Sequence, residues 1–171
     1  VGDRHTEWCH PIVVSPKPNG GVRLTADLTK LNKQVRRIVH CSRTPHDVVS
    51  NRTTGAKYFT TLDARCGYWQ LKLAEESRDL TTFICSLGRF RYLWAPMGFI
   101  STGDVYNLKG DLALDGIEQT QKIVDDILSE DVELDEHVPR VRMILERCRQ
   151  HGITLNPKKF QFAQRKVKFA G

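Results

Sequence analysis

The amino-acid sequence predicts an α+β fold in which antiparallel strand hairpins are mixed with helices. Three observations support this prediction. An Asn-Gly turn at residues 19–20 separates two apolar runs, which is a strong signal for a β-hairpin. Two adjacent acids, Asp125 and Asp126, interrupt another apolar run and indicate a second tight hairpin. The stretch 136–151 repeats apolar residues at the period of an amphipathic helix.

The first half of the chain is predicted to start with a hairpin and to continue through short helices into a strand. Thr44 has the chemistry of a helix N-cap, and Pro45 suits the first helical position. The predicted elements, in order, are strands Pro11–Ser15 and Val22–Leu28 around the turn 16–21, a short helix within Leu28–Val35, a helix through Val48 and Val49, a strand ending at Asp63, and a hairpin of Thr81–Cys85 with Arg89–Leu93.

The second half is predicted to hold two longer helices on either side of the acidic hairpin. The first spans about Thr102–Leu114 and the second about Glu136–His151, with Asp135 as N-cap, Pro139 in the first turn and Gly152 at the end. The apolar positions of the second helix are Val138, Val141, Ile144, Leu145 and Cys148. Short strands are expected around Ile153–Leu155, Phe160–Ala163 and Lys166–Ala170.

Composition limits the class of protein. With 171 residues, of which 40% are hydrophobic, the chain is long enough for one globular domain. A formal charge of +6 suits a polyanionic partner. The five cysteines are odd in number and widely spaced, which indicates reduced thiols in an intracellular protein. Neither a signal peptide nor an apolar stretch of membrane-spanning length is found, and the chain resembles a fragment of a longer one.

The acidic pair is the most informative feature for function. Like charges this close raise each other's pKa, and a divalent cation would relieve the repulsion. Asp63, at the end of the predicted strand 58–63, is a third such acid. Three carboxylates on strand ends suit a two-metal site for phosphoryl transfer. Two other interpretations exist: Asp-Asp is common in surface turns, and Asp63 could be a helix N-cap.

Four segments together resemble one family. They read WCHPIVVSPKPNGGVRLTADLTKLN, AKYFTTLDARCGYWQLKLAEESRDLTTFICSLGRFRYLWAPMGF, IVDDIL and HGITLNPKKFQFAQRKVKFAG. Their order and spacing resemble the motifs of reverse transcriptases, most closely those of gypsy-type long-terminal-repeat retrotransposons. The resemblance covers essentially the whole chain. It implies a polymerase right-hand fold with fingers and palm, an antiparallel sheet packed on helices, and no thumb.

The resemblance further implies a division of the chain and a reaction. Residues of about 1–62 and 81–97 would be fingers-like, the rest would be palm, and the primer grip would begin near residue 169. The implied activity is that of an RNA-directed DNA polymerase, a nucleotidyltransferase within a Pol polyprotein. Asp63, Asp125 and Asp126 match the catalytic metal ligands. They would hold two Mg²⁺ ions, for which Mn²⁺ can substitute, and these would activate a primer 3′-hydroxyl for in-line attack on the α-phosphate.

The same resemblance assigns residues to the nucleotide and to the template-primer. Tyr68 would be an aromatic gate that excludes a 2′-hydroxyl, which also argues against an RNA-dependent RNA polymerase. Arg23 and Lys17 would meet the triphosphate, and Lys158 and Lys159 the leaving pyrophosphate. The remaining matches are Met97 and Gly98, which would pack on base and sugar, and Asn32 and Ile123, which would face template and primer.

Several of these assignments compete with plainer ones. Tyr68 and Met97 could be core residues, and the lysines at positions 17, 158 and 159 could be solvated turn residues. Other basic residues suit phosphate contacts that ignore sequence, or ordinary surface charge, namely Arg36, Arg37, Lys57, Arg89, Arg91 and Lys122. Ile123 stands where the family usually has a tyrosine that touches the primer end, so primer placement is expected to be weakened while the metal ligands are kept.

The implied partners are an RNA or DNA template with its primer, deoxynucleoside triphosphates, and the remaining Pol domains of a parent chain: thumb, RNase H and integrase. No membrane partner is expected, and the location would be intracellular, in a cytoplasmic particle or the nucleus. An alternative function is that of a catalytically weak or inactive relic, or a co-opted domain, that binds nucleic acid. Because no thumb is expected, the fragment alone should polymerise poorly.

Overall fold

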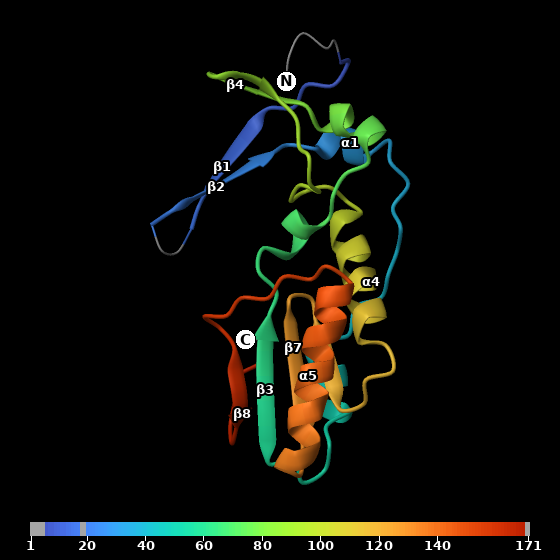
Figure 1. Ribbon diagram of the computed structural model, residues 1–171. Helices are drawn as coiled ribbons and strands as arrows, with labels where there is room; N and C mark the ends of the chain where they lie inside the picture. The colour runs from blue at the N-terminus through green and yellow to red at the C-terminus, as the bar shows by residue number, and fades with distance from the viewer. Residues whose placement is uncertain (1–5, 18–19, 170–171) are drawn as a thin grey trace. The chain divides into compact units, whose positions relative to one another are not determined.

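The computed structural model describes residues 6–17 and 20–169 and divides the chain into two compact units (Figure 1). The first unit comprises Val1–Val39 and Tyr68–Gly103, and the second comprises His40–Gly67 and Asp104–Gly171. These boundaries differ from the predicted fingers-like segments at about 1–62 and 81–97. That division concerns functional subdomains and stays a prediction, as does a primer grip near residue 169.

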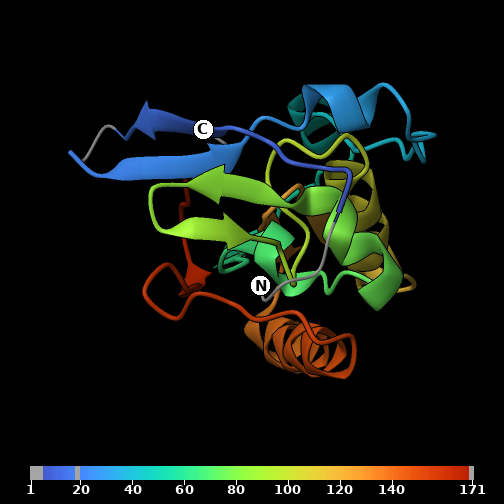
Figure 2. The same cartoon turned by 90° about the horizontal axis from the view of Figure 1, so that it is seen from above.

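The first unit consists of two small antiparallel hairpins with short helical turns. Its elements are β1 (Ile12–Pro16), β2 (Val22–Ala26), α1 (Thr29–Asn32), most of the 3-10 turn η1 (Gly67–Gln70), α3 (Glu75–Arg78), η2 (Asp79–Thr81), β4 (Phe83–Cys85) and β5 (Gly88–Phe90). The predicted pairing of the first hairpin is confirmed, with Val14 opposite Leu24, although the turn residues 18–19 lie outside the described ones. The two hairpins lie side by side in Figure 2, and His10 forms a bridge to Phe83.

The second unit is built on a four-stranded antiparallel sheet in the order β6-β7-β3-β8. Its elements are α2 (Pro45–Ser50), β3 (Tyr58–Asp63), α4 (Thr102–Leu114, whose first two residues belong to the first unit), β6 (Thr120–Ile123), β7 (Asp126–Asp131), α5 (Leu134–Gln150) and β8 (Gln161–Gln164). Helix α5 lies along the sheet in Figure 1. The α+β class with antiparallel strands is therefore confirmed.

Helix α5 differs from its prediction at its start and in its buried face. It begins at Leu134 with Glu133 as N-cap, so Asp135 lies in the first turn and the predicted Asp135 cap is wrong. Pro139 consequently falls inside the helix rather than in the first turn. The residues that α5 buries are His137, Val141, Ile144 and Cys148, whereas Val138 and Leu145 are 39% and 41% exposed. His137 is thus buried in α5, where the apolar periodicity of the sequence had predicted that Val138 would be.

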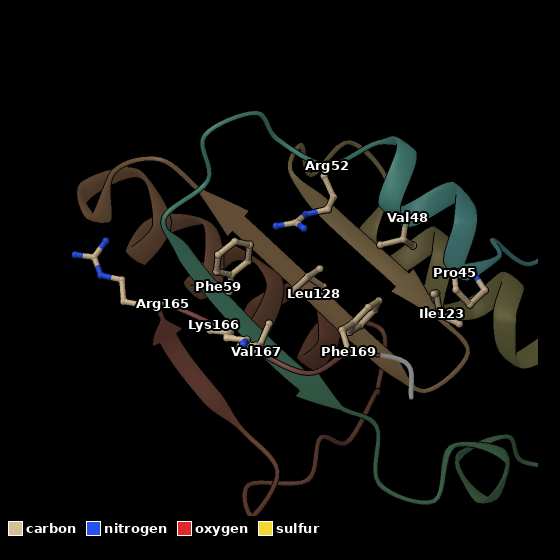
Figure 3. Close-up of a pocket in the computed structure, with 10 residues that line it drawn as sticks. All are labelled: Pro45, Val48, Arg52, Phe59, Ile123, Leu128, Arg165, Lys166, Val167 and Phe169. Carbon is tan, nitrogen blue, oxygen red and sulfur yellow. The ribbon is translucent and has the colours of Figure 1, made fainter.

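The other face of the sheet carries an apolar cluster and a cavity (Figure 3). Val48 of α2 packs there with Phe59 of β3 and Leu128 of β7. The returning chain adds Val167 and Phe169, which are part-buried against this cluster. The cavity measures about 390 Å³. Residues 166–169 are not a strand, so the predicted strand Lys166–Ala170 is wrong over its described part, and Ala170 lies outside it.

Two further expectations concern chemistry rather than fold. The cysteines within the described residues are free thiols, as predicted. No helix among those residues is both long enough and apolar enough to cross a membrane.

Candidate functional site

Three carboxylates meet at one end of the sheet in the second unit. Strand β3 ends at Asp63, which pairs directly with Asp126 at the start of β7. The hairpin from β6 to β7 turns through Val124 and Asp125, because Ile123 pairs with Asp126. The Ala64 amide donates to the Asp125 carbonyl oxygen at 2.8 Å and ties the hairpin tip to the chain beyond β3. The structure therefore brings together the three acids that the sequence singled out.

The tip of this hairpin is strained. Val124 has a φ of +51°, a left-handed conformation that a β-branched residue rarely adopts. Such a conformation costs roughly 1–2 kcal/mol and persists only where its surroundings hold it. Here the flanking pairing of Ile123 with Asp126 fixes both ends of a two-residue turn. This turn presents the Asp125 carboxylate beside the Asp63–Asp126 pair.

The local environment disfavours charge on two of the acids. Burial raises the pKa of the Asp125 carboxyl, and the nearby charge of Asp63 raises it further, while the Tyr106 hydroxyl opposes the shift by hydrogen bonding. Burial also raises the pKa of Asp126, with Asp63 as the next cause. Acids placed directly across an antiparallel pair repel each other. The arrangement therefore favours any cation that can share the three carboxylates.

Asp125 lies in a tight cradle behind the hairpin. Its Oδ1 is buried, and among the described residues it has no hydrogen-bond partner. A Cβ added to Gly67 would stand 2.4 Å from that oxygen and 2.5 Å from Cζ of Tyr106. Only a glycine therefore fits at position 67 while the carboxylate keeps its place. A buried carboxylate oxygen without a partner is costly, so the cradle holds Asp125 in an unfavourable environment.

Lys159 provides the positive charge nearest to the acids. Its Nζ lies 2.5 Å from Asp63 Oδ2, although the lysine side chain is 63% exposed. The bond to Asp63 raises the pKa of Lys159, with smaller contributions from the other two acids. The Asn156 amide donates to the Asp63 carbonyl oxygen, and the Asn156 side chain accepts from the Lys158 amide. This turn holds Lys159 beside Asp63. Both lysine side chains are exposed, and both line a hollow together with Asp63 and Asp126.

The donor set suits a hard divalent cation. Carboxylate oxygens are the ligands that Mg²⁺ and Mn²⁺ prefer, and the three acids at this end of the sheet supply them. Within the described residues, however, no group of three or more His, Cys, Asp or Glu side chains already has the arrangement of a metal site. Binding would therefore require the Asp63 and Asp126 carboxylates to turn toward the ion and Lys159 to leave Asp63.

The remaining candidates lie in the first unit. Asn32 holds the loop after Met97, because its amide donates to the Gly98 carbonyl oxygen at 2.8 Å and its Oδ1 accepts from the Ile100 amide at 3.0 Å. Gly98 has a φ of +88°, which a glycine adopts without strain. Met97 is part-buried. The structure thus brings Asn32 and Gly98 together, and it gives Asn32 a role in holding this loop.

Two cations lie on the first hairpin. Arg23 pairs with Ser15 across the strands and is exposed. Lys17 is also exposed, and its amide donates to the Gly21 carbonyl oxygen at 2.7 Å across the turn. Tyr68 is part-buried in the short 3-10 turn that follows the acid-bearing strand in sequence. The roles of these residues toward a nucleotide stay predictions.

The expectation for Lys122 as a phosphate contact is wrong. Only 7% of its side chain is exposed, and its Nζ lies 3.2 Å from Asp111 Oδ1 and 3.3 Å from Asn107 Oδ1. Its carbon stem packs on Gly110 of α4. Sequence reasoning also missed Tyr106 and the cradle glycine Gly67, because no local pattern marks a residue that packs behind a hairpin from a distant helix.

Comparison with known proteins identifies the family. Residues 15–171 match the family described as "Reverse transcriptase (RNA-dependent DNA polymerase)". The enzymatic polyprotein of Cauliflower mosaic virus (strain D/H) is 36% identical over 118 residues, which cover 68% of this chain and 18% of the polyprotein. The Pol polyprotein from transposon 412 of Drosophila melanogaster is 27% identical over 175 residues, covering 97% of this chain and 14% of that protein.

Solved structures agree with this assignment at the level of the fold. A foamy viral protease-reverse transcriptase in complex with double-stranded DNA has a TM-score of 0.90 at 23% identity, covering 98% of this chain and 30% of that one. The prototype foamy virus protease-reverse transcriptase has a TM-score of 0.83 at 25% identity, covering 94% of this chain and 22% of that one. The chain thus spans less than a third of these relatives. On the family match, the chain belongs to the reverse transcriptase (RNA-dependent DNA polymerase) family.

Proposed function

We propose that this chain carries the nucleotidyl-transfer site of an RNA-directed DNA polymerase, which transfers deoxynucleotides to a primer 3′-hydroxyl under the direction of a template. The observation that carries this proposal is the convergence of Asp63, Asp125 and Asp126 at the end of the sheet. Membership of the reverse transcriptase family supports it.

The three acids are proposed to bind two Mg²⁺ ions, with Mn²⁺ as a substitute. When bound, the ions would supply Lewis-acid activation of the primer hydroxyl and neutralise the phosphates. The contribution of the protein is to hold the carboxylates on rigid strand ends, with Asp125 fixed in its cradle between Gly67 and Tyr106. Lys159 carries a proton at Nζ and would be free to meet the leaving pyrophosphate once Asp63 turns toward a metal.

The residues of the first unit are proposed to select and hold the nucleotide. Arg23 and Lys17 would contact the triphosphate, Tyr68 would exclude a ribose 2′-hydroxyl, and Met97 with Gly98 would pack on base and sugar. Asn32 is proposed to act on the template side, and Ile123 of the second unit on the primer side. Replacing Tyr68 with Ala is expected to raise ribonucleotide incorporation, measured as the ratio of rNTP to dNTP addition. An unchanged ratio would show that Tyr68 is not the gate.

The finer classification and the partners belong to the same proposal. The sequence motifs favour a gypsy-type element within the family. Foamy viral relatives were solved with double-stranded DNA and with an RNA/DNA hybrid, which supports a template-primer as the partner of this chain. Because the matched polyproteins are much longer than the chain, thumb, RNase H and integrase are proposed as parts of a parent Pol protein. An intracellular particle or the nucleus is the proposed location.

Primer extension on poly(rA)/oligo(dT) tests the proposal directly. The wild-type chain is expected to extend the primer, weakly and only with Mg²⁺ or Mn²⁺, while Asp125→Asn reduces the rate about 10³-fold or more. Direct Mn²⁺ binding, measured by electron paramagnetic resonance without nucleic acid, should fall in the same variant. Equal background signal from both chains in both assays would overturn the polymerase function. Metal-independent binding of nucleic acid by both chains would then identify a non-catalytic binding domain.

A further inference from the structure

A continuous chain of hydrogen bonds crosses the second unit beneath α5. His137 Nε2 lies 2.6 Å from the Thr60 hydroxyl, and His137 Nδ1 lies 2.7 Å from Asp131 Oδ2. Arg140 Nε donates to the other oxygen of Asp131 at 2.9 Å. The side chains of Thr60 and His137 are fully buried, and Asp131 is 2% exposed. These hydrogen bonds connect β3, α5 and β7, and of the four side chains only that of Arg140 is part-exposed.

This network of hydrogen bonds ends on the backbone of β8. The Asp131 carboxylate accepts from Nδ1 of His137. On the other side of the ring, Nε2 of His137 and the Thr60 hydroxyl share a hydrogen bond. The Thr60 oxygen also accepts from the Ala163 amide at 3.0 Å. The network therefore links α5 to β8 through Thr60.

Ala163 lies at an irregularity in the pairing of β8 with β3. Phe59 pairs with Gln164, but two residues further along β3, Thr61 pairs with Gln161, three residues back along β8. One extra residue is therefore accommodated opposite Thr60. Ala163 takes up the bulge with a φ of +49°, a left-handed conformation that costs an alanine roughly 1–2 kcal/mol. The bond from its amide to Thr60 offsets that cost.

The bulge sets where β8 begins relative to the acids. The pairing of β8 with β3 ends at Gln161 opposite Thr61, and Lys159 lies two residues earlier, in the turn 157–159. From this turn the Lys159 side chain reaches Asp63, while the Asp63 carbonyl oxygen accepts from the Asn156 amide at the start of the turn. Without the extra residue, the register that starts from Phe59 and Gln164 would set Phe162 opposite Thr61. Such a slip moves every side chain of β8 to the other face of the sheet and shifts the end of the turn that carries Lys159.

We propose that Thr60, His137 and Asp131 form a register lock, a buried positioning device that fixes the bulge at Ala163 and thereby holds the turn that carries Lys159 beside Asp63. Aromatic contacts support the lock, because the centroid of the His137 ring lies 6.4 Å from that of Tyr58 and 6.0 Å from that of Phe162 in β8. Its residues touch no reacting atom and act through Lys159. The register itself is independent of the proposed function, whereas its consequence for nucleotide transfer rests on that function.

Hydrogen exchange at the Ala163 amide tests the first step. In the wild-type chain this amide should exchange slowly although it points at a side chain. In Thr60→Val, which keeps the shape but loses the hydroxyl, exchange should be about tenfold faster or more, and Thr60→Ser should restore protection. Fast exchange in the wild type, or equal protection in Thr60→Val, would overturn the lock. The wild-type measurement decides the question even if the valine variant does not fold.

Disulfide trapping tests the register. In a background with the exposed cysteines replaced by serine, Thr61→Cys with Gln161→Cys should cross-link under mild oxidation, and Thr61→Cys with Phe162→Cys should not. Adding Thr60→Val should shift cross-linking toward the second pair. An unchanged preference for the first pair would show that the bulge does not depend on the lock. Neither this test nor hydrogen exchange needs metal, nucleotide or primer. Both results can therefore be interpreted even if the proposed function is wrong.

A double-mutant cycle tests the consequence for catalysis. In primer extension, Lys159→Met should slow the rate at saturating nucleotide about 10²-fold, because a positioned proton donor typically contributes that much. Thr60→Val should slow the same rate, and the two changes together should cost no more than Lys159→Met alone. If the rate losses of the two single variants multiply in the double variant, Thr60 supports the fold but does not act through Lys159.

Discussion

The carboxylates at the two ends of strand β7 differ in their hydrogen-bond partners. At one end, Asp131 is 2% exposed and accepts hydrogen bonds from His137 and Arg140. At the other end, Asp126 faces Asp63, and burial raises its pKa. Asp125, next in the turn, keeps one buried oxygen without a partner among the described residues. The same sheet thus satisfies one buried acid completely and leaves others short of partners.

The difference separates an acid that stabilises the fold from acids to which the proposed function assigns a cation. A buried carboxylate with its full set of donors is stable as it stands, whereas one without them gains most from an added cation. Lys159 supplies only part of this charge, from a side chain that is 63% exposed. The comparison predicts that removing charge at the two ends will have opposite effects on stability.

The largest effect is expected at the satisfied end. In Asp131→Asn an NH₂ group replaces one of the two acceptor oxygens. This NH₂ group would lie against the N–H of either His137 or Arg140, and two donors cannot form a hydrogen bond. Removing one partner of a buried pair typically costs about 3–5 kcal/mol, and we expect a loss of about 3 kcal/mol in the free energy of unfolding. Urea denaturation measures it.

Asp135→Asn is the matched control for this change. Asp135 is exposed in the first turn of α5, so the same substitution there should alter the free energy of unfolding by no more than about 0.5 kcal/mol. If both variants lose the same small amount, the hydrogen bonds of Asp131 do not stabilise the fold, and the contrast between the two ends disappears.

Gly67→Ala is expected to disturb the other end by steric clash. The new Cβ would stand 2.4 Å from Asp125 Oδ1 and 2.5 Å from Cζ of Tyr106, so the cradle must open. We expect a loss of about 1–3 kcal/mol in stability, the usual cost of overpacking, together with weaker Mn²⁺ binding. Gly55→Ala is the control, because a Cβ there meets open space and only its φ of +78° is unfavourable. Unchanged Mn²⁺ affinity in Gly67→Ala would show that the cradle does not hold Asp125 in place.

Asp125→Asn should stabilise the metal-free chain modestly at neutral pH, because it removes a charge that burial disfavours and solvent screens only in part. The pKa of Asp125 is raised on folding, so the wild-type chain loses stability as pH rises from the ordinary carboxyl range through the folded pKa. The asparagine variant lacks this loss. The gap between the two unfolding curves should therefore widen with pH and then stay constant. If the free energies of unfolding of the two chains differ by the same amount at every pH, ionisation of Asp125 does not destabilise the folded chain.

Local patterns predicted much of the fold and the identity of the acids. The acidic hairpin and the strand ending at Asp63 follow from residue types that act within a few positions. Helix α4 follows its predicted range, and Thr44 caps α2 with Pro45 as its first residue. Each of these features depends on neighbours in the sequence, which is why pattern reasoning was sufficient.

The features that prediction missed depend on contacts between distant segments. Periodicity favoured Val138 for the buried face of α5, but the hydrogen-bonding partners Thr60 and Asp131 draw His137 inward instead. Lys122 looked like a surface cation, and its burial follows from Asp111 and Asn107 on α4. The bulge at Ala163 left no sequence signal, because the residue there is not a glycine.

The smallest predicted effect concerns an exposed acid that accepts two hydrogen bonds. Asp47 accepts from the amide and hydroxyl of Thr44 in the capping box of α2, and these bonds lower its pKa. Its stabilising effect should be present at neutral pH and disappear as pH falls through the lowered folded pKa, which is opposite in sign to Asp125 over the same acidic range. Urea denaturation of Asp47→Asn against wild type at several acidic pH values measures this, and Asp135→Asn is the control. If Asp47 gave the same sign as Asp125, burial and hydrogen bonding would not be what distinguishes the acids of this protein.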